Sequence, residues 1–466
     1  MGRAVRAADN ERMIRTAESG GVLPVSPTYE TRLFIDGEFR EANGKRTWKL
    51  INPATEEEIC EIREASEKDV EAAVQAAHKA FASWSLNIGA RRRGELLMKL
   101  ANLLQEEKEN IAHIECINVG KPIQYARGDM DACIANLKYY SGWADKITGG
   151  SYIPVLESEK ISCHTRREPV GVVAAIVPWN FPLMLTVMKA AAALACGCTV
   201  VVKTSEKSPL SALALCKLVQ KAGFPAGVFN VLNGFGESVG AHLIRQPLVQ
   251  KVSFTGSSSV GCLVAQECAA TVKRVTLELG GKSPLIILKD ADIQKAAEAT
   301  WKGLFHNSGQ CCVACSRILV QCDVYNEFVE KLKETVSKKA KLSNPLETCC
   351  TQGPIVDSKQ LARVISYIEE GKKEGAKCVL GGVKKEGKFN AQTIRSMGSE
   401  PASSPPAFLL QITSLHAGTV WVNTYLSGDV GIPFGGYKAS GYGREGGEEG
   451  LLPYLETKTV VMSIEL

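Results

Sequence analysis

A regular alternation of apolar and helical segments between residues 170 and 269 limits what this chain can fold into more than any other feature of its sequence. Four short apolar runs alternate with four stretches that have helical spacing. The apolar runs are 170–177, 199–203, 228–232 and 251–254, and the helical stretches are 183–196, 208–222, 237–246 and 258–269. Repeated strand–helix–strand units of this kind form parallel sheets with right-handed crossovers. We therefore predict an open parallel-sheet α/β domain.

A second, shorter series of the same kind begins after Gly280-Gly281. Its apolar runs are 284–288 and 317–320, and its helical stretches begin at Asp292 and Tyr325. The predicted fold class is therefore α/β, with two open parallel-sheet domains joined near Gly280. The smaller second domain is expected to cover residues 281–446.

The N-terminal part of the chain completes the first domain. Asp36-Gly37 between apolar residues predicts a tight β-hairpin. Residues 66–83 and 91–118 place apolar side chains three and four positions apart, as surface helices do. We assign residues 29–150 and 168–280 to the first domain.

Two segments fit neither domain. Apolar and polar residues alternate within 151–167, which predicts an exposed hairpin, and the run 458–464 also has the character of a strand. Free strand edges pair readily with another chain unless they are covered. We therefore expect residues 151–167 and 447–466 to form an oligomerisation arm in a homodimer or homotetramer.

The composition excludes two classes of function. The net charge is only +5, and basic residues are interspersed with acidic ones, so nothing indicates a nucleic-acid partner. The most apolar stretch, 170–202, is interrupted by Pro178 and Pro182 and contains Lys189. Neither half predicts a membrane-spanning helix, which needs about 20 apolar residues. A small-molecule substrate is the remaining expectation.

Cysteine usage indicates the compartment. The 16 cysteines are scattered along the chain, several lie in apolar runs, and no secretory signal opens the sequence. We expect a reducing environment and place the protein in the cytoplasm. Residues 1–28 carry four arginines among three acidic residues. We interpret them as a disordered tail, with a mitochondrial transit peptide as the alternative.

Five ordered segments combine reactive groups with residues that shape the backbone. They are Pro178–Pro182, Phe254–Ser257, Leu277–Pro284, Phe305–Arg317 and Pro433–Lys438. Together they resemble the signatures of the aldehyde dehydrogenase superfamily, nearest to its broad cytosolic and mitochondrial class. The resemblance runs from about Leu33 to Gly382 and again from Ala417 to the end. It implies a Rossmann-like domain that binds NAD, a catalytic domain and an aldehyde as substrate.

The resemblance implies that Cys312 is the nucleophile, which attacks the aldehyde as a thiolate. Sulfur suits this role because the adduct must first expel hydride and then persist as a thioester until water arrives. Cys312 and Cys315 also have the C-x-x-C spacing of a metal site. No second pair with matching spacing follows, so no metal is expected. Cys315 stands where the family usually has Gly, which suggests a changed loop.

Two further catalytic roles follow from the resemblance. Glu278 is expected to be the general base that activates the deacylating water. Asn180 is expected to donate its side-chain amide to the oxyanion, together with the backbone amide of Cys312. Taken without the resemblance, Glu278 reads as a paired structural carboxylate and Asn180 as a residue that satisfies the turn between two prolines.

The expected cofactor residues follow the ends of the predicted strands, where open α/β sheets bind ligands. Lys203 and Glu206 resemble the pair that holds the adenosine ribose, and a carboxylate there favours NAD over NADP. The remaining members are expected near the pyrophosphate and the adenine side of the cofactor. They are Trp179, Gly234, Gly256, Ser257 and Gly261.

The resemblance breaks between Gly382 and Ala417. The family normally has a longer stretch there with a Glu-Glu-x-Phe-Gly-Pro segment, whose second Glu binds the nicotinamide ribose. Residues 383–416 stand in its place, and Ser399–Pro406 within them is typical of an irregular linker. We therefore expect the catalytic domain to lack several strands and a helix, and hydride transfer to suffer.

Three functions remain to be weighed. The first is an NAD-dependent aldehyde dehydrogenase. The second is a catalytically impaired relative that folds and binds NAD or co-assembles without turnover. An acylating enzyme that uses coenzyme A is disfavoured because Glu278 is retained.

The substrate is expected to be apolar. Phe181, Met188, Phe305 and His306 are expected to line the tunnel beside Cys312, and such a set suits aliphatic or aromatic aldehydes. His306 reads equally well as a surface or hydrogen-bonded histidine. No cluster of charges in the sequence indicates an amino- or carboxy-aldehyde.

Overall fold

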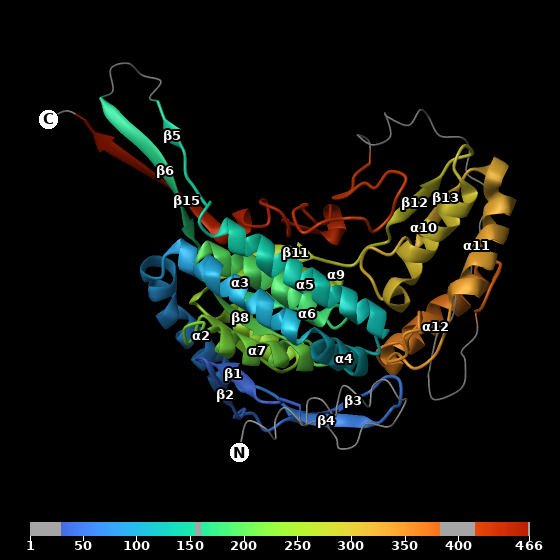
Figure 1. The fold of residues 1–466 in the computed structure, drawn as a ribbon, viewed down its shortest axis with the longest axis horizontal. Helices are drawn as coiled ribbons and strands as arrows, with labels where there is room; N and C mark the ends of the chain where they lie inside the picture. The colour runs from blue at the N-terminus through green and yellow to red at the C-terminus, as the bar shows by residue number, and fades with distance from the viewer. Residues whose placement is uncertain (1–28, 154–159, 383–414, 465–466) are drawn as a thin grey trace. The chain divides into compact units, whose positions relative to one another are not determined.

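The computed structural model describes residues 29–153, 160–382 and 415–464 (Figure 1).

The large sheet has five parallel strands at its centre. The sheet has eight strands in the order β14-β11-β10-β7-β8-β9-β1-β2. Its central strands are β11 (Arg274–Glu278), β10 (Val249–Thr255), β7 (Val172–Ile176), β8 (Thr199–Lys203) and β9 (Phe229–Leu232). The predicted parallel α/β sheet is confirmed, because β7 and β8 are buried along their whole length and are covered on both faces.

The remaining strands of the large sheet are antiparallel edges. The predicted hairpin is confirmed, with Asp36 and Gly37 both at positive φ, which is the backbone that a two-residue turn requires. These edge strands are β1 (Leu33–Ile35), β2 (Glu38–Arg40) and β14 (Gly441–Tyr442). A separate antiparallel pair, β3 (Thr47–Ile51) and β4 (Glu58–Arg63), lies outside the sheet.

The connecting helices create a crevice at one edge of the sheet. They are α6 (Pro182–Cys196), α7 (Leu210–Ala222), α8 (Ala241–Arg245) and α9 (Ser258–Ala269). The chain winds outward from β7 through β8 and β9, then returns to β10 and β11 on the other side of β7. The strand order therefore reverses beside β7, and ligands bind at such a reversal, beyond the carboxyl ends of the strands. The helix expected over 237–246 is instead a π-helical turn, Gly236–Gly240, followed by α8.

Each face of the large sheet packs against its own hydrophobic core. Alternate residues of β7 belong to different cores, with Val173 and Ala175 in one and Val172 and Ala174 in the other. Figure 1 shows the helices of the first core across one face. The N-terminal helices are α2 (Glu67–Ala82), α3 (Ala90–Glu106), α4 (Lys108–Val119) and α5 (Ile123–Trp143). The single helix expected over 91–118 is wrong, because the backbone leaves helical geometry at Glu107.

The second domain has a much smaller sheet. Among the described residues, β12 (Pro284–Ile287) and β13 (Arg317–Val320) form a parallel pair, which confirms the predicted strand type. Its helices are α10 (Ile293–Phe305), α11 (Tyr325–Lys339) and α12 (Ser358–Lys373). One face of the pair stays open, since Ile286 is 39% exposed and Leu319 is 49% exposed.

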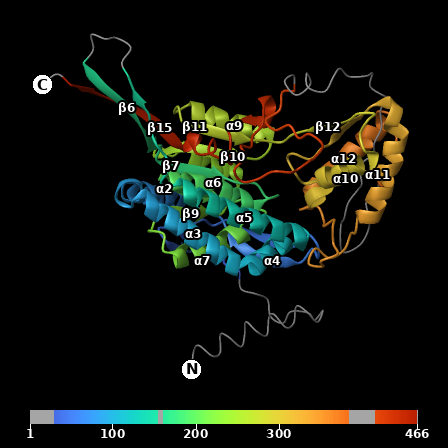
Figure 2. The same ribbon diagram turned by 45° about the horizontal axis from the view of Figure 1, so that its top comes forward.

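A three-stranded antiparallel sheet forms the arm. It consists of β5 (Ser151–Tyr152), β6 (Ile161–Pro169) and β15 (Leu455–Ser463). The predicted hairpin is confirmed, and the C-terminal strand pairs with β6 over nine residues. Figure 2 shows the arm extending away from the large sheet.

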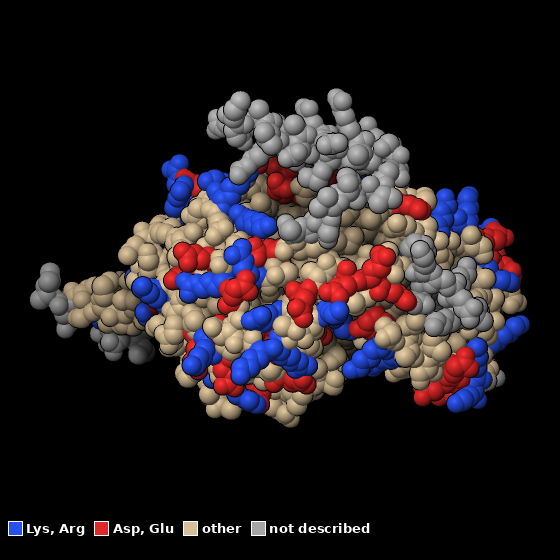
Figure 3. All heavy atoms as spheres, turned by 90° about the horizontal axis from the view of Figure 1, so that it is seen from below, with Lys and Arg blue, Asp and Glu red and all other residues tan. Residues whose placement is uncertain are grey.

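Two features of the structure concern nucleic-acid and membrane partners: the distribution of charge on the surface and the apolar length of the helices. On the face seen in Figure 3, basic and acidic side chains are interspersed and form no continuous basic stripe. No helix within the described ranges is long and apolar enough to cross a membrane.

Arg93 joins three parts of the helical layer. It is 7% exposed and donates hydrogen bonds to the backbone carbonyls of Trp84, Ser85, Ile88 and Ala195. Arg93→Met is expected to lower the free energy of unfolding by about 3 kcal/mol, because it leaves buried carbonyls without a charged donor. Urea denaturation would measure this loss. The matched control is Arg91→Met, whose exposed side chain pairs with Glu95 and should change the midpoint very little; equal effects would contradict the role of Arg93.

Candidate active site

The parallel strands bring the predicted catalytic loops to one edge of the sheet. Thr255 at the end of β10 pairs with Glu278 at the end of β11, and Phe254 pairs with Ile176 at the end of β7. The loop after β7 contains Asn180 and leads into α6, which starts with Pro182 in its first turn. Proline is favoured there because the first helical amides have no partner within the helix. The ends of three neighbouring strands therefore frame the site.

The loop that carries Cys312 is tied to the loop that carries Asn180. The side-chain amide of Asn307 donates to the carbonyl oxygen of Asn180 at 3.1 Å, and the amide of Asn180 donates to the carbonyl oxygen of Gln310 at 3.1 Å. Asn307 and Ser308 both have positive φ, a strained conformation for residues other than glycine. The fold therefore brings Asn180 against the Cys312 loop. In this conformation the side-chain amide of Asn180 donates to Gln310, two positions before Cys312.

Cys312 is a half-buried thiol beside a second thiol. The hydrogen bond with Cys311 and burial both raise the pKa of Cys312 well above its ordinary value. Tyr425 holds the other side of this loop, since its hydroxyl donates to the carbonyl oxygen of Val313 at 2.8 Å. A thiol in this state requires a base before it can act as a nucleophile. Cys315 is fully buried, and its sulfur contacts the carbonyl oxygen of Thr300 at 3.8 Å.

Glu278 is a buried carboxyl whose proton is held tightly. Burial, with smaller effects of Glu445 and Cys312, raises its pKa to about 9 against the opposing effect of Lys189. Its Oε1 atom makes no hydrogen bond with any residue that the structure describes. An unpaired buried oxygen of this kind is available to a water molecule or a proton donor. The interaction with Cys312 shows that the predicted base and the predicted nucleophile lie near each other.

A buried charge cluster that the sequence did not reveal lies next to Glu278. Lys189 of α6 binds Glu445 and also donates to the hydroxyl of Ser253 at 3.2 Å. The same hydroxyl donates to Glu445 at 3.1 Å. Lys189 had a sequence signal, a lone lysine in an otherwise apolar helix, but we read it only as an interruption of that run. Glu445 had no local signal, because its partner is 256 residues away.

The proposed ribose residues lie at the end of β8. Lys203 ends this strand, and its ammonium lies 3.8 Å from the carboxylate of Glu206. Burial lowers the pKa of Lys203 to about 8, although Glu206 opposes the shift. The indole of Trp48 donates to the backbone carbonyl of Glu206 at 2.8 Å and holds this loop in place. Trp179 lies under the ammonium of Lys207, which is 5.4 Å from its ring centre.

Ser257, Gly256 and Gly261 lie at the start of α9, whereas Gly234 follows β9. The Ser257 hydroxyl accepts from the amide of Val260, so it caps the helix, and the amide of Gly256 donates to the carbonyl of Glu278. A side chain at Gly261 would come within 2.5 Å of Leu279, and one at Gly234 within 2.3 Å of Val239. The expected cofactor residues therefore lie at the carboxyl ends of β8, β9 and β10, on both sides of β7, where the strand order reverses.

No metal centre is evident in the part of the chain that the structure describes, where no group of three or more His, Cys, Asp or Glu is placed to hold an ion.

The expected tunnel residues divide into two groups. Phe181 and Met188 pack against the first core, and the His306 ring stacks on Phe181 with centroids 5.9 Å apart. Phe305 instead stacks on Trp301 in the small core of the second domain.

The raised pKa of Glu278 gives a prediction about stability. A carboxyl with a folded-state pKa of about 9 and an ordinary value of 4.5 stabilises the fold fully only below the ordinary value, and this contribution is lost as pH rises through 9. Glu278→Gln cannot ionise. Its free energy of unfolding, measured by urea denaturation, should therefore rise relative to the unaltered protein between pH 5.5 and pH 8. A difference that stays constant with pH would show that Glu278 is not protonated in the folded state.

Comparison with known proteins identifies the family of this chain. The model of the aldehyde dehydrogenase family matches residues 39–397 and 407–460. Human retinaldehyde dehydrogenase 3 is 40% identical over 480 residues, with 93% of each chain covered. Rat cytosolic aldehyde dehydrogenase 1 is 41% identical over 481 residues, with 93% of this chain and 95% of the relative covered.

Solved structures agree with these sequence matches. The NAD⁺ complex of an aldehyde dehydrogenase from Bacillus cereus has a TM-score of 0.90 at 38% identity and covers 96% of this chain and 99% of that one. Betaine aldehyde dehydrogenase from Staphylococcus aureus in complex with NAD⁺ has a TM-score of 0.88 at 31% identity, with 94% and 95% covered. On this fold, these strand-end loops and these matches, the chain belongs to the aldehyde dehydrogenase family.

Proposed function

We propose that this chain oxidises an aldehyde to a carboxylic acid with NAD, through a thiohemiacetal and then a thioester on Cys312. The observation that carries the proposal is the pair of hydrogen bonds, donated by side-chain amides, that joins the Cys312 loop to the Asn180 loop beside buried Glu278. In the first step the ionised form of Glu278, which its raised pKa makes the minor form near pH 7, takes the proton of the Cys312 thiol, and the sulfur attacks the aldehyde carbon. Glu278 releases this proton to solvent before the second step. NAD, when bound, would supply the acceptor for the hydride that leaves this carbon.

Two residues then complete the reaction. Asn180 turns its amide from Gln310 toward the oxyanion, which also lies beside the backbone amide of Cys312. Glu278 takes a proton from water as the water attacks the thioester, and the acid leaves as the Cys312 sulfur regains its proton. The unpaired Oε1 atom of Glu278 supports this role, because no described residue uses its capacity to accept a hydrogen bond.

We further propose which parts of the chain bind NAD, which part carries the nucleophile and which part joins the subunits. Residues 29–150 and 168–280 bind NAD through Lys203, Glu206 and the start of α9, and residues 281–446 carry the nucleophile. The exposed arm supports a homodimer or homotetramer built through residues 151–167 and 447–466, since Val461 and Met462 of β15 remain uncovered. All 16 cysteines are free thiols, which supports the cytoplasm as the compartment.

An alternative function has its own support. The expected loss of the family's nicotinamide-ribose segment falls largely on residues outside those described, but the open face of β12 and β13 is consistent with missing strands. In this alternative the chain binds NAD and does not turn over. Adding NAD and a short aldehyde to the purified protein and following NADH absorbance separates the two functions.

Replacing the nucleophile should separate chemistry from cofactor binding. Cys312→Ala is expected to abolish NADH production and to leave the Kd for NAD nearly unchanged, because the sulfur reacts with the aldehyde and does not hold the cofactor. Steady-state kinetics and calorimetric NAD titration would measure both. Cys322→Ala, an exposed thiol on the far side of β13, is the control. Turnover above a tenth of the original rate would refute the role of Cys312.

Restoring the segment expected to be absent should reveal what it supplies. Replacing residues 383–416 with the family's longer stretch, including its Glu-Glu-x-Phe-Gly-Pro segment, is expected to raise turnover by about 100-fold, the scale of a cofactor misplaced by about 1 Å. NADH absorbance at saturating NAD is the measurement. A folded chimera no more active than its parent would contradict this account, as would a native chain with the ordinary enzymatic rate of about 10 per second.

A further inference from the structure

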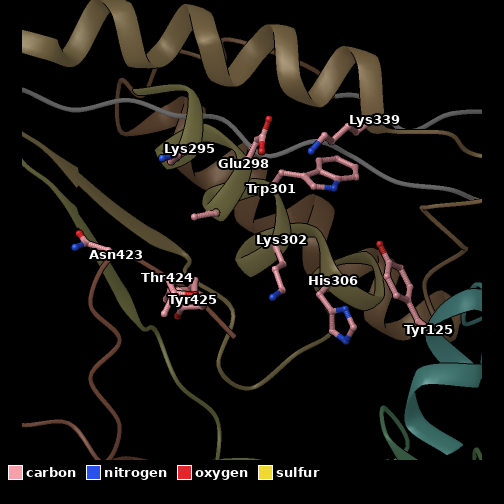
Figure 4. Close-up of a pocket in the computed structure, with 11 residues that line it drawn as sticks. Tyr125, Lys295, Glu298, Trp301, Lys302, His306, Lys339, Asn423, Thr424 and Tyr425 are labelled. Atoms are coloured by element: carbon pink, nitrogen blue, oxygen red, sulfur yellow. The ribbon is translucent and has the colours of Figure 1, made fainter. Parts of the chain in front are cut away.

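A cavity of about 490 Å³ borders the loop of the nucleophile. Its walls come from one side of α10, the end of α11, Tyr125 of α5 and the segment 423–425. Figure 4 shows Lys302 and His306 directed to the same side of the cavity, with Tyr125 next to the imidazole and Thr424 and Tyr425 opposite. The sequence could not reveal this cavity, because its walls are up to 300 residues apart in the chain.

The charge of this cavity is positive. Three lysines, Lys295, Lys302 and Lys339, line it with a single carboxylate, Glu298. Lys295 is already paired with Asp292 at 3.6 Å. Lys302 and Lys339 form no ion pair with any residue in the described ranges, so these two ammonium groups and the carboxylate of Glu298 leave the cavity with one positive charge in excess. A concave site with uncompensated positive charge attracts anions.

Neutral hydrogen-bonding groups lie beside these charges. Burial, together with Lys121 and Lys302, lowers the pKa of His306 to about 4, so its ring is neutral near pH 7. A neutral imidazole donates one hydrogen bond, and the hydroxyl of Tyr125 is a second possible donor. The Tyr125 and His306 rings are in edge contact, with centroids 4.7 Å apart, which fixes the imidazole in place.

The cavity shares two walls with the Cys312 loop. His306 begins the short turn that leads to the nucleophile. Tyr425 donates to the carbonyl of Val313, the residue directly after Cys312. Cys312 itself does not line the cavity, so the two places are joined through these shared residues, His306 and Tyr425.

We propose that this cavity receives a carboxylate at the far end of the substrate, so that the preferred substrates are short aldehydes with a carboxylate at the opposite terminus. Lys302 is the main charge partner, with His306 and Tyr125 as donors. This inference rests on the proposed aldehyde oxidation and replaces the expectation of an apolar substrate. The expectation of an apolar substrate was made without Lys302 and Lys339, which are distant in the sequence and line the same cavity.

Binding of the reaction product tests the site without requiring turnover. Succinate, the product expected from 4-oxobutanoate, should bind the unaltered protein more tightly than butyrate in calorimetric titrations. Lys302→Met keeps the length of the side chain and removes its charge, so it should weaken succinate binding about tenfold or more, the scale of a hydrogen bond to a charged group. Lys302→Glu should weaken it further. Lys338→Met, an exposed lysine one position before Lys339 and outside the cavity, is the matched control and should leave binding unchanged.

The outcomes distinguish this site from the proposed reaction. Equal affinity for succinate and butyrate, or succinate affinity that Lys302→Met leaves intact, would overturn the carboxylate site. In turnover assays the ratio of kcat/KM for 4-oxobutanoate to that for butanal should fall about tenfold in Lys302→Met. If neither aldehyde yields NADH but succinate still binds through Lys302, the proposed reaction is wrong and the carboxylate site stands.

Discussion

The hydrogen bonds between the Cys312 loop and the end of β7 are the constraint on which the chemistry depends. Asn307 and Asn180 each donate an amide to a carbonyl of the opposite loop. Each bond contributes only about 0.5–1.5 kcal/mol net. The positive-φ conformations of Asn307 and Ser308, however, cost about 1–3 kcal/mol each and persist only when their surroundings enforce them. The position of the sulfur is therefore a property of two loops from two different sheets.

Strand alternation arranges the charges beneath those loops. Ser253 and Lys251 of β10 and Thr276 and Glu278 of β11 are at positions that share one face, because side chains alternate along a strand. Lys251 donates to the hydroxyl of Thr276 at 2.6 Å. This face meets α6, where Lys189 would be costly to bury alone. Glu445 neutralises it, which leaves Glu278 as the carboxyl that keeps its proton.

The parts of the fold that sequence predicted are those with local signals. The strand Thr199–Lys203 was predicted to the residue because a fully buried parallel strand is a continuous apolar run. Helix α5 was missed, because its buried face includes Asp129 and Asn136, which obscure the apolar period. The helix predicted over 91–118 was interrupted at Glu107, where one residue out of helical geometry leaves the apolar spacing unchanged.

The site divides in the same way. Cys312, Glu278 and Asn180 were named from short ordered segments that resemble a family, and their roles stay predictions until the variants are measured. Lys189 and Glu445 could not be paired from the sequence, because the strand order that joins them is a tertiary property. The lysines of the cavity are likewise separated along the chain and share no motif.

The segment 415–430 contributes Asn423, Thr424 and Tyr425 to the wall of the cavity. Residues 415–430 contain no helix or strand, and they meet the rest of the second domain through single side-chain bonds, such as that from Tyr425 to Val313. Tyr425 lines the cavity and also donates to the carbonyl of Val313, so a change in this wall acts directly on the residue that follows Cys312.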